Sequence, residues 1–218
     1  MAVNQILNWV DGAGWLVLSG GSDALSEVRA MALTRIAADG GIAYVGVNTS
    51  DDGALMDDFN ELGAPAGFWV DIMTDTDQGI HQRLAEAALI VLSDMTDVAM
   101  ARSALLGAAA EGMLVAFQRG AVILAEGHAA MLFGRVVVTE SGQVLDGLHW
   151  LRNAYIVPAI TSIAESSSAR KVLLARQAAI AIGIGVGSAL VLGPDAQVEL
   201  WGQSQVAVAL GGNISDTT

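Results

Sequence analysis

Three histidines, at positions 81, 128 and 149, are the candidates for proton transfer in this sequence, which contains no cysteine. A mechanism that pairs a nucleophile with an imidazole base must use one of them. His81 lies in a stretch of helical periodicity and His149 in a loop-like segment, where histidines usually have no catalytic role. His128 is the strongest candidate, because it follows Glu126 and Gly127 at a sharp turn between an apolar run and a small-residue segment. An imidazole at a helix N-terminus tends to be neutral and can accept a proton.

Few hydroxyl groups are available for His128 to activate. The nearest candidates are Ser93 and Thr96, at the end of the apolar run 89–93. If this run and the run before His128 are parallel strands, their carboxyl ends meet at one edge of a sheet. A hydrolytic site with His128 as base and one of these hydroxyls as a relocated nucleophile is therefore one hypothesis.

Acidic residues near the same strand ends allow two further interpretations. Asp94, Asp97, Glu126 and His128 together have the ligand types that a divalent cation accepts. Alternatively, Asp94 or Asp97 caps a helix that begins near Val98, which is the commoner use of an aspartate in this position.

The elements that would position these residues alternate along the first part of the chain. Stretches of helical periodicity separate five short apolar runs, at residues 15–19, 42–47, 67–72, 89–93 and 121–125. Strands that are apolar on both faces and alternate with helices are typical of a parallel sheet covered by helices on both sides.

The spacing of the apolar runs changes after residue 125. From there the runs come closer together and predict hairpins at one edge of the sheet. The stretch 161–180 is predicted to be the last long helix. We therefore predict a single α/β domain over residues 1–218. Its expected architecture is a three-layer α/β/α fold with a mostly parallel, flavodoxin-like sheet and antiparallel edge strands near the C-terminus.

Ligands of open parallel sheets bind beyond the carboxyl ends of the strands. In this sequence the segments expected at that edge are 19–23, 48–52, 93–97 and 125–128. Each of them contains acidic or small polar residues, so we expect the ligand-binding cleft there.

The segment 119–134, RGAVILAEGHAAMLFG, resembles the nucleophile turn of the cyanophycinase and alpha-aspartyl dipeptidase family of serine peptidases. That family reads approximately R-G-A-V-I-x-G-T-S-A-G-A-M-x-x-G here. The residues that agree include Arg119, Gly120, Ala121, Val122, Ile123, Ala130, Met131 and Gly134. The opening GWLVLSGGSD also matches the family's first strand and glycine turn, at Gly20 and Gly21. The resemblance implies a fold like that of the class I glutamine amidotransferases.

The catalytic residues of that family are missing from the matching positions. The resemblance places the serine on Gly127, the histidine on Ile160 and the acidic residue on Val186. A T-G-G-D-Q-like turn of the family is replaced by the acidic segment 93–97, where negative side chains would oppose an oxyanion. The resemblance therefore implies a peptidase fold whose triad has been lost.

Charge and composition exclude several classes of partner. Lys and Arg together number 10 against 23 Asp and Glu, giving a net charge of −13. So acidic a chain is a poor partner for nucleic acid and for an anionic membrane surface. The uncharged run 177–194 is at the lower length limit for a membrane span, but its glycines and alternating pattern favour two buried strands. The absence of cysteine and of a signal-peptide pattern favours a cytoplasmic location.

The apolar content predicts self-association. The chain is 53% hydrophobic, with a mean hydropathy of +0.52, which exceeds what one core of this size needs. We therefore expect a homo-oligomer, a dimer in the simplest case, that buries apolar surface on the helix 161–180 or on the strands after residue 193.

These observations favour a non-catalytic relative of the serine peptidases that binds a small molecule or peptide, or acts as a subunit of an assembly. We expect no cofactor and no metal. The alternative is an active hydrolase with a relocated nucleophile near His128. The residues predicted to form the cleft are Gly20, Gly21, Asp94, Glu126, Gly127 and His128.

Overall fold

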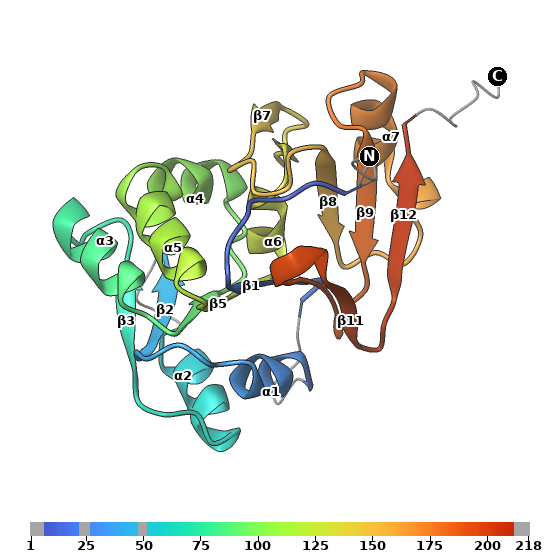
Figure 1. The fold of residues 1–218 in the computed structure, drawn as a ribbon. Coiled ribbons are helices and arrows are strands. Elements are labelled where there is room, and N and C mark those ends of the chain that lie inside the picture. Colours follow the sequence, from blue (N-terminus) through green and yellow to red (C-terminus); the bar gives the residue numbers. More distant parts are fainter. Residues whose placement is uncertain (1–6, 22–26, 48–51, 212–218) are drawn as a thin grey trace.

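A seven-stranded sheet forms the centre of the protein (Figure 1). The computed structural model describes residues 7–21, 27–47 and 52–211. The strand order is β11-β10-β1-β5-β4-β2-β3. Five neighbouring strands are parallel: β1 (Trp15–Ser19), β2 (Ile42–Gly46), β3 (Gly67–Asp71), β4 (Leu89–Leu92) and β5 (Val122–Glu126). Two antiparallel strands, β10 (Ser188–Leu192) and β11 (Val198–Gly202), complete one edge.

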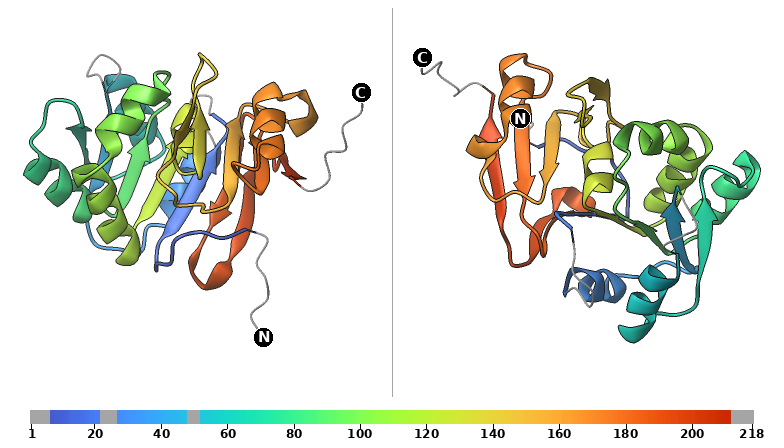
Figure 2. Two further views of the ribbon diagram at one scale, coloured as in Figure 1. Left: turned by 90° about the horizontal axis from the view of Figure 1, so that it is seen from above. Right: turned by 180° about the vertical axis from the view of Figure 1, so that it is seen from behind.

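Helices cover both faces of this sheet, as the alternation predicts (Figures 1 and 2). Along β1, Val17 packs with residues of α1 (Glu27–Thr34) and α2 (Asp52–Glu61). Leu16 and Leu18 point to the opposite face, which belongs to a second apolar cluster. The helices of that cluster are α3 (Asp77–Ala85), α4 (Val98–Leu105), α5 (Ala108–Gln118), α6 (His128–Leu132) and α7 (Ser167–Leu174). The predicted three-layer α/β/α architecture is confirmed.

The C-terminal half only partly follows the prediction of edge hairpins. β10 and β11 do form an antiparallel edge, but β8 (Ala154–Pro158), β9 (Ile180–Ile184) and β12 (Val206–Leu210) form a separate three-stranded sheet, in the order β12-β9-β8. β8 and β9 are parallel, so they are not a hairpin. A two-stranded hairpin consists of β6 (Val136–Val138) and β7 (Val144–Asp146). Edge hairpins and a separate three-stranded sheet require the same spacing of apolar runs. The spacing alone therefore does not show which strands pair.

The predicted long helix over 161–180 is wrong in extent. The structure has a short 3-10 turn, η2 (Ile163–Glu165), followed by α7 (Ser167–Leu174). The helix begins where the Ser166 hydroxyl accepts a hydrogen bond from the Ala169 N–H at 3.1 Å. It ends before Arg176, which has a φ of 54°. A second 3-10 turn, η3 (Pro194–Ala196), follows β10.

The suspect run 177–194 contains β9 and β10, as the strand interpretation predicts. In the part of the chain that the structure describes, no single helix has the length and apolar character needed to cross a bilayer. The bent pair α4 and α5, with 70° between its helices, meets that criterion by length and composition only.

Apolar side chains remain exposed on the surfaces where self-association is predicted. Leu174 at the end of α7 is exposed, as are Val198 and Leu200 on β11 and Val208 and Leu210 on β12. The dimer itself stays a prediction.

Candidate functional site

A cleft of about 770 Å³ opens at the carboxyl ends of the parallel strands. Its walls come from the ends of β1, β2, β4 and β5, from α1, α2 and the start of α4, and from the segments after β8 and β9. Four of the predicted cleft residues line it: Gly20, Gly21, Asp94 and Glu126. Gly127 and His128 adjoin Asp94 at its rim. Ser22, Asp23 and residues 48–51, which were also expected at this edge, lie outside the described residues.

The strand, turn and helix around Gly127 have the geometry of a nucleophile elbow. Gly127 lies between β5 and α6 with a φ of 55° and a ψ of −128°. Its N–H donates to the Ser19 carbonyl at 3.1 Å, which fixes the turn to the end of β1. A residue with a side chain is strained in this conformation, whereas glycine adopts it readily. The turn therefore places at its centre a glycine, which has no side chain and adopts this conformation without strain.

The Asp94 carboxylate occupies the space that a side chain at position 127 would need. A Cβ built on Gly127 would lie 2.6 Å from Asp94 Cγ and 2.7 and 2.8 Å from its two oxygens. Real Cβ atoms do not approach other atoms so closely. Asp94 and a serine at position 127 are therefore incompatible without a shift of the Asp94 side chain.

Asp94 also holds His128. Its Oδ1 accepts a hydrogen bond from the His128 backbone N–H at 2.8 Å and lies 2.8 Å from Nδ1 of the imidazole. When Nδ1 carries the proton that Asp94 accepts, Nε2 is left as a hydrogen-bond acceptor. Both side chains are about half exposed, at 46% for His128 and 52% for Asp94. The pair has the base and orienting acid of a triad but lies on the open side of the elbow.

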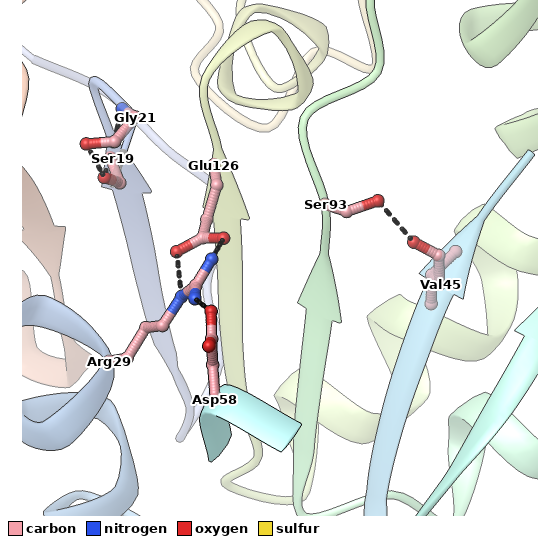
Figure 3. A network of polar contacts seen from close by, with 7 residues as sticks. All are labelled: Ser19, Gly21, Arg29, Val45, Asp58, Ser93 and Glu126. Carbon is pink, nitrogen blue, oxygen red and sulfur yellow. Dashed lines mark hydrogen bonds and ion pairs between the residues drawn. The ribbon is translucent and has the colours of Figure 1, made fainter. Parts of the chain in front are cut away.

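A buried ion cluster forms around Glu126, the residue before Gly127 (Figure 3). Arg29 of α1 donates to Glu126 through Nε at 2.9 Å and through Nη2 at 2.7 Å. Its Nη1 contacts Asp58 Oδ2 at 2.7 Å. Burial opposes the charged guanidinium, but the hydrogen bonds and charges of Glu126 and Asp58 outweigh it and raise the pKa of Arg29. Both Glu126 oxygens pair with Arg29. Glu126 also lines the cleft, where this pairing holds its carboxylate in place.

The hydroxyls proposed as relocated nucleophiles do not contact His128. Ser93 Oγ donates to the Val45 carbonyl at 3.5 Å, away from Glu126 (Figure 3). Thr96 is exposed in the cleft wall. Between these hydroxyls and His128 the structure gives no hydrogen bond.

The metal hypothesis is not supported by the described part of the chain. Glu126 is held by Arg29, and Asp97 caps α4 by accepting a hydrogen bond from the Met100 N–H at 2.9 Å. Over residues 7–21, 27–47 and 52–211, no three His, Asp or Glu side chains gather closely enough to hold an ion. The capping interpretation is confirmed for Asp97.

The other two positions that the family resemblance matched to triad residues lie in different surroundings. Val186 is exposed and lines the cleft. Ile160 is half-buried, and its Cγ2 lies 3.0 Å from the position of a Cβ on Gly183, over β9. In this loop it is Ala159 that lines the cleft. The assignment of Ile160 as the former histidine position stays a prediction.

The remaining histidines do not line the cleft. His81 lies half-buried in α3, and His149 is exposed in the loop after β7. These placements agree with the surroundings predicted for them.

Arg29 and Asp58 are the charged cleft residues that the sequence analysis missed. A signal for Arg29 exists, because it lies on the same helical face as the buried Val28 and Ala32 of α1. A charge on an apolar helical face requires a partner. The partner could not be identified, since Glu126 lies 97 residues away in the sequence.

Comparison with solved structures identifies peptidases of the same fold. A peptidase from an acI-B1 Actinobacterium superposes with a TM-score of 0.76 at 20% identity, covering 92% of this chain and 93% of the peptidase. A proposed peptidase E from Listeria monocytogenes EGD-e gives a TM-score of 0.65 at 12% identity, over 87% of this chain and 98% of the other. No family model and no curated protein matches the sequence. At these identities the likeness concerns the fold.

Proposed function

We propose that this protein binds a small molecule or short peptide in the cleft at the elbow and does not cleave it. The proposal combines a peptidase-like fold with a cleft at the position where parallel α/β sheets hold their ligands. It treats the chain as a relative of the serine peptidases that keeps the architecture without the chemistry.

The observation that carries the proposal is the pairing of Gly127 with Asp94. A position without a side chain has no nucleophile, and the volume that such a side chain would need holds a carboxylate. A negative charge at this point also opposes the oxyanion of a tetrahedral intermediate, which peptidases stabilise with hydrogen-bond donors. Two features of the elbow thus work against acyl transfer.

Covalent labelling and a peptide-turnover assay test the absence of catalysis. We expect no adduct in the intact mass after incubation with a fluorophosphonate probe, and no product from a dipeptide library analysed by mass spectrometry. Stoichiometric labelling, or turnover by pure protein, would overturn the proposal.

A cleft-filling variant tests the binding role. Ala54 is exposed on α2 and lines the cleft, whereas Asn60 is exposed on the same helix and does not line it. We expect Ala54→Trp to abolish the NMR shift changes caused by library peptides, and Asn60→Trp to preserve them. Equal binding by the two variants would place the ligand elsewhere.

A second candidate function is an active hydrolase that uses the Asp94–His128 pair. The specific observation in its favour is the 2.8 Å contact between Asp94 Oδ1 and His128 Nδ1. With Nδ1 protonated, Nε2 could take a proton from a water molecule that attacks a bound substrate. Since this route needs no serine, a fluorophosphonate probe would not detect it.

Histidine substitutions separate this candidate from the proposal. If the Asp94–His128 pair hydrolyses peptides, His128→Ala should abolish turnover. The control variant His81→Ala, a change in α3, should leave turnover intact. Turnover equally reduced in both variants, or absent from the unaltered protein, removes the candidate.

A further inference from the structure

A second cavity adjoins the cleft. This cavity has a volume of about 410 Å³ and shares Thr96 and Asp97 with the cleft. Its other walls come from Val98 and Ala99 at the start of α4 and from the β6–β7 turn, at Thr139, Glu140, Ser141 and Gln143. The hairpin is tied to α4 by a hydrogen bond from Arg102 to the Asp146 carbonyl. The two cavities thus adjoin at Thr96 and Asp97, and we refer to them together as the groove.

The groove is strongly negative. Among the described residues that line it, five carboxylates (Asp58, Asp94, Asp97, Glu126 and Glu140) face one guanidinium, that of Arg29. Arg29 is bound by two of those carboxylates. The three others, at positions 94, 97 and 140, are exposed. Carboxylates that line a cleft of low-dielectric walls focus their field into it and attract cations.

The wall of the groove also offers apolar and donor groups. Trp69, Met95 and Met100 line the cleft beside the carboxylates. The Trp69 Nε1 is buried and has no hydrogen-bond partner among the described residues. An indole N–H only donates, so a group that satisfies it would have to be an acceptor, and a peptide carbonyl is one such group. Methionine and tryptophan side chains pack well against the methylene stem of a long basic side chain, and tryptophan attracts its cationic group.

We propose that this groove takes a linear peptide with basic side chains. Its positive groups would lie near Asp94 and Asp97 in the cleft and near Glu140 in the second cavity. This inference rests on the binding function proposed above and adds to it the charge and the length of the ligand. A bare polyamine shares the positive charge but has no carbonyl acceptors.

The test measures binding of fluorescent five-residue peptides at low salt by polarisation. The probes are Ala-Lys-Ala-Lys-Ala, its glutamine and glutamate counterparts, and unlabelled spermidine as competitor. We expect the lysine peptide to bind about tenfold or more tightly than the glutamine peptide and the glutamate peptide not to bind, because two charge pairs of about 0.7 kcal/mol each give this factor. Spermidine is expected to compete only weakly.

Charge-neutralising variants place the ligand in the groove. Glu140→Gln changes the second cavity, and Asp97→Asn changes the shared wall while keeping a residue that can cap α4. Each is expected to weaken lysine-peptide binding about threefold to fivefold. The matched control is Glu165→Gln, which removes an exposed carboxylate of η2 outside both cavities. Equal losses in the control and the two groove variants would reduce the effect to net charge and overturn the inference.

The outcomes separate this inference from the function on which it rests. Preferred binding of the glutamine or glutamate peptide, blocked by Ala54→Trp, would overturn the basic-peptide inference and support the binding function. Spermidine binding as tight as that of the lysine peptide would overturn the choice of a peptide. If no probe of any charge binds, both proposals fail.

Discussion

The residues on either side of Gly127 take part in two polar contacts in opposite environments. Glu126 is 3% exposed and forms an ion pair with Arg29, whose side chain is 9% exposed. His128 and Asp94 are each about half exposed. An exposed pair contributes little to stability, whereas a buried charge that loses its partner is costly. The comparison teaches that packing fixes one side of the elbow, whereas the pair on the other side is open to solvent.

Removal of Arg29 is expected to have the largest effect. Arg29→Met removes the guanidinium that both Glu126 and Asp58 contact, and should lower the free energy of unfolding by about 3–5 kcal/mol. Urea denaturation measures it. The control is Arg35→Met, which breaks the half-exposed Arg35–Glu199 pair and its stacking on Trp15, and should cost about 1–2 kcal/mol. Equal costs would contradict the distinction between the buried and exposed pairs.

Gly127→Ala is expected to cost about 1–3 kcal/mol, because it adds backbone strain and a clash with Asp94. Gly63→Ala separates the two contributions, since Gly63 has a φ of +83° and nothing within 4 Å of its Cβ position. In an Asp94→Gly background the cost of Gly127→Ala should fall towards that of Gly63→Ala, as measured by a double-mutant cycle. Additive costs would show that Asp94 does not block position 127.

The buried side of the elbow should also respond to alkaline pH. Burial raises the pKa of Tyr44 from 10.0 to about 12, although the charge of Arg29 acts in the opposite direction. Because the folded pKa lies above the unfolded one, the stabilisation is complete below pH 10 and is lost as the pH rises towards 12. Urea denaturation over this range should show a decline in stability that is smaller in Tyr44→Phe. An identical decline in both proteins would assign it to other groups.

The smallest effect is expected at the exposed pair. Asp94→Asn keeps the shape of the side chain and an acceptor for the His128 N–H, so the free energy of unfolding should change by less than about 0.5 kcal/mol. Thermal denaturation at neutral pH checks this expectation. A loss above about 2 kcal/mol would mean that the Asp94–His128 pair is as structural as the Arg29 cluster.

The sequence predicted the alternation of strands and helices more reliably than the pairing of strands. Buried parallel strands such as residues 89–92 are apolar on both faces, and this property is visible locally. The sequences of β8, β9 and β12 do not show which strands they pair with, because one apolar strand can pair with many others. The early end of α7 depends on one residue, Arg176, in a left-handed conformation, and basic residues carry no signal for it.

For the candidate site, the sequence indicated which residues lie near the cleft. The structure showed which of them contact one another. The framing residues of the elbow and the small residue at its centre were evident from the motif. The position of the Asp94 side chain beside Gly127 could not be read from the motif. Asp94 follows β4 and Gly127 follows β5, and the two residues meet only because these strands are neighbours in the sheet. Asp97 could be predicted because a cap acts within its own helix, while Arg29 could not be matched with Glu126.

The amino-acid sequence by itself determined the alternation of strands and helices in the first part of the chain, the glycine at the elbow and the excess of negative charge, because each of these is a property of single residues or short runs. Only the tertiary structure decided that Arg29 pairs with Glu126, that Asp94 fills the space beside Gly127, and that the remaining carboxylates line the groove. These are distances between residues remote in the chain. They are fixed by how the strand ends and helices pack together, a collective result of burying the two faces of the sheet.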